Sequence, residues 1–447
     1  MKWHSYRSVG LAALLASAPL AAQDAPRRIT FDEAVGIALH DNASVIRAAN
    51  AAVLSEAMVK QQKQSFLPSL SVSVSGANTM GRTFDQADGR VIDRNTQSMN
   101  AGVSSSVTLF DGFRNVSNLR AAQLSEDASG EALARVKQTA AFTVASNFLA
   151  LIAQQEQLKV QEQTLAAQEA QEAQIDRFVQ AGTRPISDLY QQQATVAATR
   201  ASVVETKRAV EVAKTDLMQT LQLDAAQEYE FVSPAVGEAS LDRRYSLDSL
   251  MTAALRHRSD LEAEKARVDA AAQGVRAAAA GKLPSVSLSA GYSTGLNSAN
   301  ELPVRDQLDQ RRGGSVSLGV SIPLYDRGTT ALAEQRAQIE ADNARLALDE
   351  QQQSVALEVR RAYLDHETAK ERLRAAQAQN QAAEQALAAV RERYRVGAAT
   401  LVEVTTAQSS QAQAAAALVN ARYTLVFQQA LMSYYTGELD PERMTLG

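Results

Sequence analysis

The side chains with the clearest potential for chemistry follow two glycines. Gly182 is followed by Asp188, and Gly397 is followed by Glu403. Thr400 and Glu403 have the spacing of a capping box, in which a hydroxyl and a carboxylate satisfy free amide groups at the start of a helix. A carboxylate in a first helical turn also interacts favourably with the helix dipole. Each acid is therefore predicted to lie in the first turn of a helix.

Both glycines interrupt long runs of helix-forming residues. Residues 329–396 contain no glycine or proline and consist mainly of Ala, Gln, Glu, Arg and Leu, which favour helices. Gly397 supplies the left-handed residue at which helices commonly end. The sequence predicts a helical hairpin over residues 329–436 with its tip near Gly397, and its first arm would be roughly 100 Å long at 1.5 Å per residue. The same pattern predicts a hairpin over residues 115–222, with its tip near Gly182.

The chain consists of two similar halves. The segment ITFDEAVGIALHDNASVIRAANAAV, which begins at Ile29, aligns without gaps with YSLDSLMTAALRHRSDLEAEKARVD, 216 residues later. Each half is predicted to open with a helix of about 35 residues that ends before a proline, Pro68 or Pro284. We expect a first repeat over residues 23–237, closing with a connecting layer, and a second over 238–447, closing with a C-terminal tail.

After each of these prolines the periodicity changes from helical to two. Serines alternate with Leu and Val, which predicts strands with one apolar face and one Ser-lined face. Strands of this length and pattern are typical of outer-membrane barrels. The alternative is a soluble sandwich, but four strands make one too small to stand between such long helices. The predicted strands cover residues 67–77, 102–110, 283–292 and 315–324, and residues 78–100 and 293–314 are predicted to be long external loops.

The first 22 residues have the features of a secretory signal peptide. Lys2 and Arg7 precede a short apolar core, and small residues precede a predicted cleavage site near Ala22. Removing the two basic residues changes the formal charge from −5 to −7, which argues against a nucleic-acid partner. The chain has no Cys and hence no disulfide or lipid-anchoring thiol. No other stretch approaches 18 consecutive apolar residues, so membrane insertion is expected to use strands.

The sequence contains no constellation typical of an enzyme. It has no Cys nucleophile, no GxSxG, no phosphate-binding loop and no HExxH. His40, His257 and His366 lack the spacing of metal ligands, and His366, in the charged segment YLDHETAKE, is predicted to be exposed to solvent. We therefore predict no catalytic residues, no cofactor and no metal site.

Four strands per chain cannot close a barrel. An open strand edge is not tolerated in lipid, so closure is expected to need several chains. Phe110, Phe113, Tyr292 and Tyr325 are predicted to lie at strand ends, where an interfacial belt of aromatic residues would place them.

Taken together, these features resemble the TolC-like outer-membrane efflux protein family. The resemblance is carried by the two tips, RFVQAGTRPISDL and RYRVGAATLVEV, by the LFDG and LYDRG turns, and by the two LPS strand starts. It implies a mainly α fold with transmembrane β structure: a homotrimer with a twelve-stranded barrel in the outer membrane, on a long periplasmic helical barrel.

The resemblance also implies a function. The protein would be a passive exit duct of a tripartite efflux or type I secretion system, working with a periplasmic adaptor and an inner-membrane transporter. The residues alone leave one alternative, a periplasmic coiled-coil adaptor or structural protein that never enters a membrane. That alternative explains the helices and the signal peptide but not the alternating strands.

Members of this family have a periplasmic gate built from acids, a Tyr and an Arg. Asp188 and Glu403 match the acids, and Tyr394 matches the Tyr. Two positions depart from the family pattern, because Thr406 and Ala399 stand where an Asp and an Arg would be expected.

Other residues of the tips have expected roles as well. Helix capping alone would also explain Asp188 and Glu403, so a pore role and a capping role both stay open. Gly182 and Gly397 are the expected tip turns and adaptor docking points. The candidate counter-charges of the gate are Arg184, Arg393 and Arg395.

Overall fold

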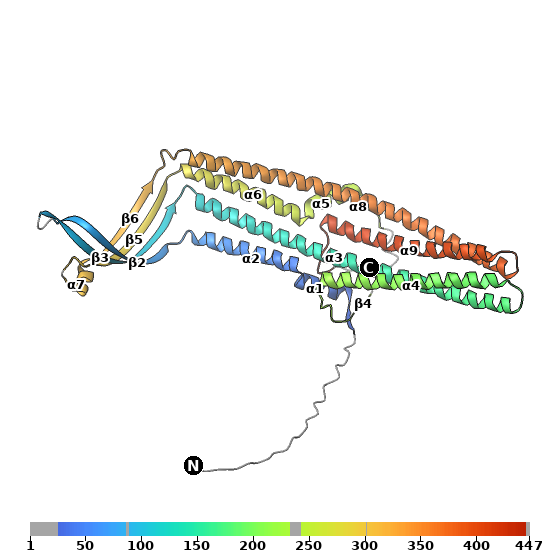
Figure 1. The fold of residues 1–447 in the computed structure, drawn as a ribbon. Helices are drawn as coiled ribbons and strands as arrows, with labels where there is room; N and C mark the ends of the chain where they lie inside the picture. Colours follow the sequence, from blue (N-terminus) through green and yellow to red (C-terminus); the bar gives the residue numbers. More distant parts are fainter. Residues whose placement is uncertain (1–25, 86–88, 233–242, 301, 444–447) are drawn as a thin grey trace, which may run out of the picture.

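The computed structural model describes residues 26–85, 89–232, 243–300 and 302–443. The predicted signal peptide lies outside these ranges. Figure 1 shows a long molecule with a β-sheet at one end and two helical hairpin tips at the other. This arrangement confirms the predicted combination of a mainly helical body with a strand-rich end.

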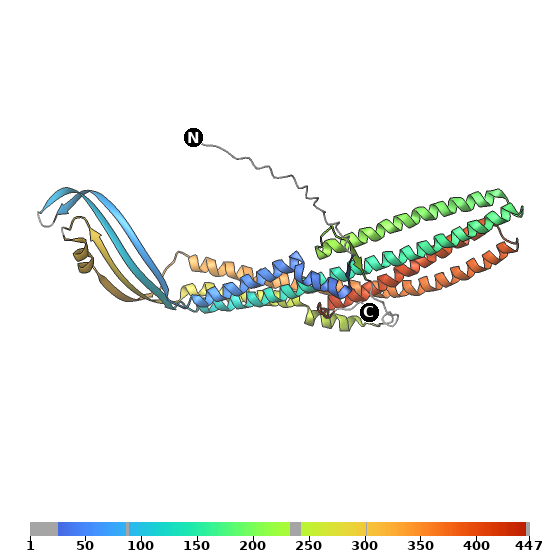
Figure 2. The same ribbon diagram turned by 90° about the horizontal axis from the view of Figure 1, so that it is seen from below.

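The sheet contains four antiparallel strands in the order β2-β3-β5-β6. Apart from Ser105, which is paired with Leu70, their serines face one side. There the hydroxyl oxygens of Ser71 and Ser104 are 2.8 Å apart, and those of Ser289 and Ser317 are 2.7 Å apart. The Leu and Val side chains face the other side and are largely exposed. Figure 2 shows the strands bending away from the helices. The bounds are β2 Ser69–Asp85, β3 Arg90–Phe110, β5 Ser285–Asn297 and β6 Gly313–Ser321.

The first external loop predicted from the sequence is wrong. Strands β2 and β3 stay paired from Ser69 opposite Ser106 to Asp85 opposite Arg90, so most of residues 78–100 is a β-ribbon. The ladder continues after the serine alternation stops, because backbone pairing does not require an apolar face. The second segment contains a short helix, α7, Val304–Gln310. Tyr292, expected at a strand end, lies inside β5.

The opening helix of each half is broken in two. Helix α1, Phe31–Asp41, is followed by α2, Ala43–Gln64, and the break is at Asn42, which is extended and caps α2 through Ser44. Helix α5, Leu247–His257, is followed by α6, Ser259–Ala279, and the break is at Arg258. A short 3₁₀ turn, η2, Ala280–Lys282, leads into β5. The prediction of one continuous helix in each half is therefore wrong.

Two helices run the length of the body. Helices α3, Arg114–Gln180, and α8, Thr329–Arg395, have 67 residues each. Helices α4, Ile186–Leu221, and α9, Leu401–Thr436, return from the tips. Near the sheet the helices lie side by side in the order α2-α3-α6-α8, and near the tips in the order α4-α3-α9-α8. The body is thus one layer of helices, four across.

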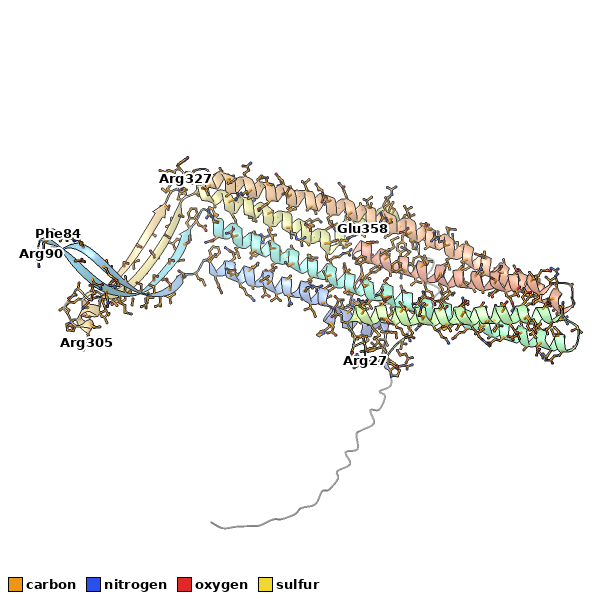
Figure 3. All side chains as sticks on the ribbon, in the orientation of Figure 1. Arg27, Phe84, Arg90, Arg305, Arg327 and Glu358 are labelled. Carbon is orange, nitrogen blue, oxygen red and sulfur yellow. The ribbon has the colours of Figure 1, made fainter. Side chains whose placement is uncertain are left out.

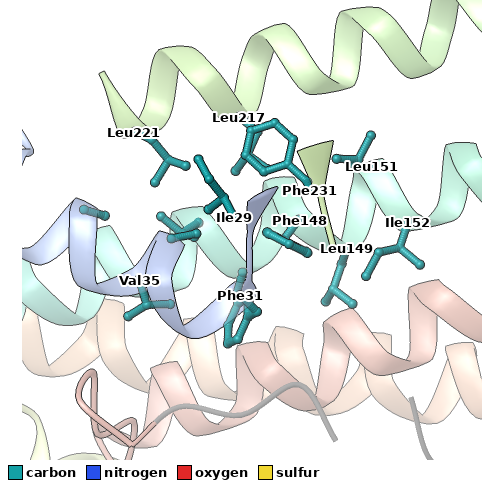
Figure 4. Close-up of a cluster of buried hydrophobic side chains, with 14 of the residues drawn as sticks. Ile29, Phe31, Val35, Phe148, Leu149, Leu151, Ile152, Leu217, Leu221 and Phe231 are labelled. Carbon is teal, nitrogen blue, oxygen red and sulfur yellow. The ribbon is translucent and has the colours of Figure 1, made fainter. Parts of the chain in front are cut away.

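The largest apolar core of the described residues lies midway along the body, between the helices near the sheet and the helices near the tips. Strands β1, Arg27–Ile29, and β4, Tyr229–Phe231, pair in parallel and cover this core. Phe148 of α3 is fully buried and contacts Phe31 and Phe231 edge to face. Figure 4 shows these rings among aliphatic side chains from α1, α3 and α4. An 18-residue window of α3 is apolar enough by composition to cross a membrane, but half of it is buried in the protein.

A buried ionic cluster joins the helices at the same level. Arg258 is 3% exposed and donates to Asp260 at 2.5 Å and to Glu358 at 2.6 Å. Arg135 lies 3.7 Å from Asp260, and its guanidinium carbon is 3.9 Å from the ring centre of Tyr434. Burial opposes ionisation of Asp260, but Arg258 outweighs this effect and lowers the pKa of the carboxyl. The cluster links α3, α6, α8 and α9 at the point where α5 gives way to α6.

The prediction that His366 is solvent-exposed is wrong. Its side chain is fully buried in α8, and its ring contacts Tyr245 edge to face with the ring centres 4.9 Å apart. The charged neighbours in the sequence lie on the other faces of the helix. Its Nδ1 atom is 3.3 Å from the Glu367 carboxylate, but among the described residues neither ring nitrogen has a partner with hydrogen-bond geometry.

Candidate gate at the hairpin tips

Both helical hairpins turn through the same backbone motif. Gly182 has a φ of 71° and Gly397 a φ of 83°, so both glycines adopt the predicted left-handed conformation. At the second tip, the Gly397 amide donates to Tyr394 O at 3.1 Å and the Ala398 amide to Arg393 O at 2.8 Å. At the first tip, the Gly182 amide donates to Val179 O and the Thr183 amide to Phe178 O, both at 2.9 Å, so each of the two helices ends in a Schellman motif.

The two returning helices begin differently. Thr400 and Glu403 form the predicted capping box: the Glu403 amide donates to Thr400 Oγ1 at 3.3 Å and the Thr400 amide to Glu403 Oε1 at 3.2 Å. Helix α4 begins after Pro185 and has no side-chain cap among the described residues. Asp188 lies in its first turn without a capping bond. The structure therefore accounts for Glu403 as a cap and leaves Asp188 without that role.

An apolar cluster holds the two tips together. Ile175 of the first hairpin packs with Tyr394, Ala399, Leu401 and Val404 of the second, and all five are buried. Ala399 departs from the family pattern in the sequence, and here it fills this contact with a methyl group. A charged side chain at this position would have to leave the cluster.

Three of the predicted gate residues meet beside this cluster. The Arg184 guanidinium donates to Tyr394 O at 2.7 Å, and its central carbon lies 4.3 Å from the centre of the Tyr394 ring. Tyr394 is 5% exposed, and its hydroxyl has no hydrogen-bond partner with good geometry among the described residues. Burial raises the pKa of Tyr394, Arg184 opposes that shift, and the nearby Asp188 carboxylate adds to it. Arg184, Tyr394 and Asp188 thus form one group, although they come from different hairpins.

The other two predicted counter-charges have local partners. Arg393 lies 3.4 Å from the Glu403 carboxylate and donates to Ala398 O at 3.0 Å, so it ties the end of α8 to the start of α9. Arg395 pairs with Glu392 of its own helix at 2.6 Å. Neither contact crosses to the first hairpin, so among these three arginines Arg184 is the one that contacts the opposite tip in the described part of the chain.

The sequence did not predict that several glutamines of the hairpin helices are buried. Gln192 is fully buried and donates to Gln168 O at 3.1 Å, and Gln408 donates to Gln171 Oε1 at 2.5 Å across the two hairpins. Nothing in the Gln-rich composition distinguishes these from exposed glutamines. An open hollow of about 540 Å³ lies between α3 and α8, and Gln171 and Tyr394 line it.

A protein-family model described as outer membrane efflux protein matches residues 35–221 and 250–438. The two matches cover both halves of the chain, each from its opening helix to the end of its hairpin. The chain belongs to this family.

Individual relatives agree with this assignment. The outer membrane efflux protein BepC of Brucella suis is 25% identical over 77% of this chain and 73% of its own length. The proteases secretion protein PrtF of Dickeya chrysanthemi is 26% identical over 66% of this chain and 63% of its own length. The solved structure of the outer membrane protein VceC from Vibrio cholerae has the same fold, with a TM-score of 0.77 at 18% identity over 91% of this chain and 96% of VceC.

This efflux-family chain is an outer-membrane exit duct with a periplasmic helical body, as the sequence predicted. The named relatives are efflux and secretion proteins, not enzymes. The alternative of a periplasmic coiled-coil protein that never enters a membrane is wrong, because it accounts neither for the family match nor for the four-stranded sheet.

Proposed function

We propose that three copies of this chain close into one continuous passive duct, which spans the outer membrane as a twelve-stranded barrel and the periplasm as a helical barrel. Within one chain, β2 and β6 are the edges of the sheet and pair on one side only. Unpaired backbone groups at such an edge would be costly in lipid. Pairing β6 of each copy with β2 of the next would remove every edge.

The observation that carries this proposal is an apolar stripe along α8. Its members are 49–66% exposed in the single chain and recur mostly every seven residues, as in a coiled-coil seam. Helix α2 at the opposite edge of the helical layer also exposes apolar side chains, including Ile46 and Val53. Burying the stripe against α2 and α4 of a second copy would continue the helical layer into a cylinder. The stripe consists of Leu332, Ile339, Leu346, Leu357 and Leu364.

The tips would form the closed end of the duct. Asp188 and Glu403 of three copies would surround the mouth, with Tyr394 and Arg184 holding the two hairpins of each copy together. A periplasmic adaptor would dock near Gly182 and Gly397 and couple the duct to an inner-membrane transporter. We assign the chain no catalytic role, so its cargo would be set by these partners, with protease secretion by a relative as one precedent.

Charged substitutions in the stripe test this proposal. Ile339→Glu with Leu346→Glu should convert the detergent-extracted trimer to monomer, because two carboxylates would be buried at each of the three proposed interfaces between copies. Gln338→Glu with Ala347→Glu adds the same charge beside the stripe and should leave the trimer intact. Native mass spectrometry measures both results. A stable, membrane-inserted monomer of the unaltered chain would overturn the architecture.

A further inference from the structure

Helix α7 and the residues around it lie on the apolar face of the sheet. Tyr292 is paired with Gly314, and Thr294 with Ala101, and directly opposed residues of antiparallel strands point to the same side. Val316 and Leu318 lie on that side, whereas the serines face the other. The segment between β5 and β6 therefore packs against the outside of the proposed barrel and not over its lumen.

The position of α7 is fixed by specific bonds. Thr294 Oγ1 donates to Leu308 O at 2.7 Å, which joins β5 to the helix. Gln307 is 5% exposed; its amide nitrogen donates to Leu302 O at 2.8 Å and to Asn300 O at 3.1 Å, and its oxygen accepts from the Asn297 amide at 2.9 Å. A buried side chain with three bonds of this kind holds the segment in one conformation.

Between α7 and β5 is an open hollow of about 600 Å³. Its floor contains Tyr292 and Thr294. Its rim carries four charged residues: Arg305, Asp306 and Asp309 of α7, and Arg312, two residues after the helix. Asp309 and Arg312 pair at 2.9 Å, and Arg305 has no ion-pair partner among the described residues. The apolar Val304 beside it is 60% exposed. Figure 3 shows Arg305 at the end of the molecule farthest from the helical tips.

The hollow lies at the level along the strands where the edge of the membrane is expected. Seven steps separate Ser285 from Tyr292, about 23 Å of strand at 3.3 Å per residue, and a tilted barrel strand crosses the hydrocarbon core in about 9–11 residues. A tyrosine at this level lies where aromatic girdles form. An amphipathic helix here would place apolar side chains among acyl chains and arginines among headgroups.

We propose that α7 is a lipid-binding element that lies in the headgroup layer of the outer surface of the membrane. Arg305 and Arg312 would bind lipid phosphate, and Asp306 and Asp309 would face the cationic groups that accompany phosphate in that layer. The occupant is a lipid surface because the hollow is continuous with the lipid-facing side of the sheet and has mixed charge of the kind a headgroup layer presents. This inference rests on the proposed barrel.

Fluorescence quenching tests the position of α7. Trp3 is the only tryptophan of the sequence and belongs to the predicted signal peptide, so an introduced tryptophan would be unique in the exported chain. Val304→Trp, Leu318→Trp and Val396→Trp would each be reconstituted as the full trimer in vesicles of phosphatidylcholine and phosphatidylethanolamine brominated near the headgroup. The Leu318 and Val304 reporters should each lose on the order of half their emission, and the Val396 reporter at the tip should lose none.

The outcomes separate the two proposals. Quenching at Leu318 without quenching at Val304 would overturn the role of α7 and leave the barrel standing. Absence of quenching at both would overturn the barrel and, with it, this inference. A second copy of the chain seated on the hollow would also give an unquenched Val304 reporter, and would overturn the lipid assignment.

Matched arginine variants test the phosphate contact. In the Val304→Trp background, Arg305→Gln with Arg312→Gln should reduce quenching about twofold or more, because the helix loses its phosphate contacts. Arg311→Gln removes a neighbouring charge that does not line the hollow and should leave quenching unchanged. Equal quenching in all variants would show that apolar contact alone seats the helix and would overturn phosphate binding.

Discussion

Arg184 lies over the ring of Tyr394, 210 positions away in the chain, with its guanidinium carbon 4.3 Å from the ring centre. The same guanidinium donates to the Tyr394 carbonyl at 2.7 Å. These two contacts join the first hairpin tip to the second through polar groups. The state of the proposed gate should therefore depend on them.

Arg184→Ala should loosen the closed tip. It removes a cation–π contact worth about 0.5–1 kcal/mol and a charged hydrogen bond worth about 1.5–3 kcal/mol. We expect a higher single-channel conductance in planar bilayers, with the proposed trimer intact. Arg395→Ala is the control, because within the described ranges the ion pair of Arg395 is with Glu392 of its own helix. Equal conductance for Arg184→Ala and the unaltered protein would rule out this contact as a latch.

Gly397→Val should impair export without preventing trimer assembly. The left-handed φ of 83° costs a β-branched residue about 1–2 kcal/mol or more, although no described atom lies within 4 Å of an added Cβ. The strain would distort the end at which the proposed adaptor docks. Gly130→Ala, in the interior of α3, should instead stabilise the helix by about 1 kcal/mol and leave export unchanged. Cellular export with correctly localised protein is the measurement, and full export by the valine variant would contradict the prediction.

The sequence predicted correctly those helix ends that depend on nearby residues in the chain. Helix α8, expected to span residues 329–396, ends at Arg395, because strong helix formers and a following glycine determine its length. The breaks at Asn42 and Arg258 were missed because neither residue is a glycine or proline. Arg258 leaves the helical conformation where its side chain joins a buried ionic cluster, and that is a tertiary effect.

The sequence and its family resemblance named the acids, the tyrosine and the arginines of the candidate site, but not the contacts among them. The contact of Arg184 with Tyr394 depends on how two distant hairpins pack. His366 was missed although a signal existed. It continues a stripe of buried residues at spacings of four and three, whereas its charged sequence neighbours suggested exposure. The stripe comprises Val355, Val359, Ala362, His366, Ala369 and Leu373.

His366 should make the stability of the folded protein depend on pH. Burial lowers its pKa in the folded state, so the unfolded chain binds a proton more readily than the folded chain does. Stability should therefore be fully present above about pH 6.5, the ordinary pKa of His, and should fall as the pH drops below that value. The charged groups beside the ring, Glu367 and Lys370, act in opposite directions on it.

Thermal unfolding of the extracted trimer at several pH values measures this effect. His366→Phe keeps a ring against Tyr245 and removes the titration, so its melting temperature should vary less with pH between 5 and 7 than that of the unaltered protein. His257→Gln alters an exposed ring and should leave the pH dependence as it is. Identical pH profiles for the unaltered protein and His366→Phe would contradict the assignment.

Substitutions of Asp188 and of Glu403 should have different effects on the ion preference of the pore and on the stability of the protein. Glu403 already serves Thr400 and Arg393, whereas Asp188 has no capping bond and lies close to Tyr394. Asp188→Asn should therefore reduce cation preference in planar bilayers with little loss of stability, because it removes three carboxylates from the mouth of the proposed trimer. Glu403→Ala should cost about 1 kcal/mol per cap, whereas Glu403→Gln keeps the capping pattern and removes only the charge. If Asp188→Asn and Glu403→Gln both leave ion preference unchanged, the two acids do not line the pore, and Glu403 acts as a helix cap alone.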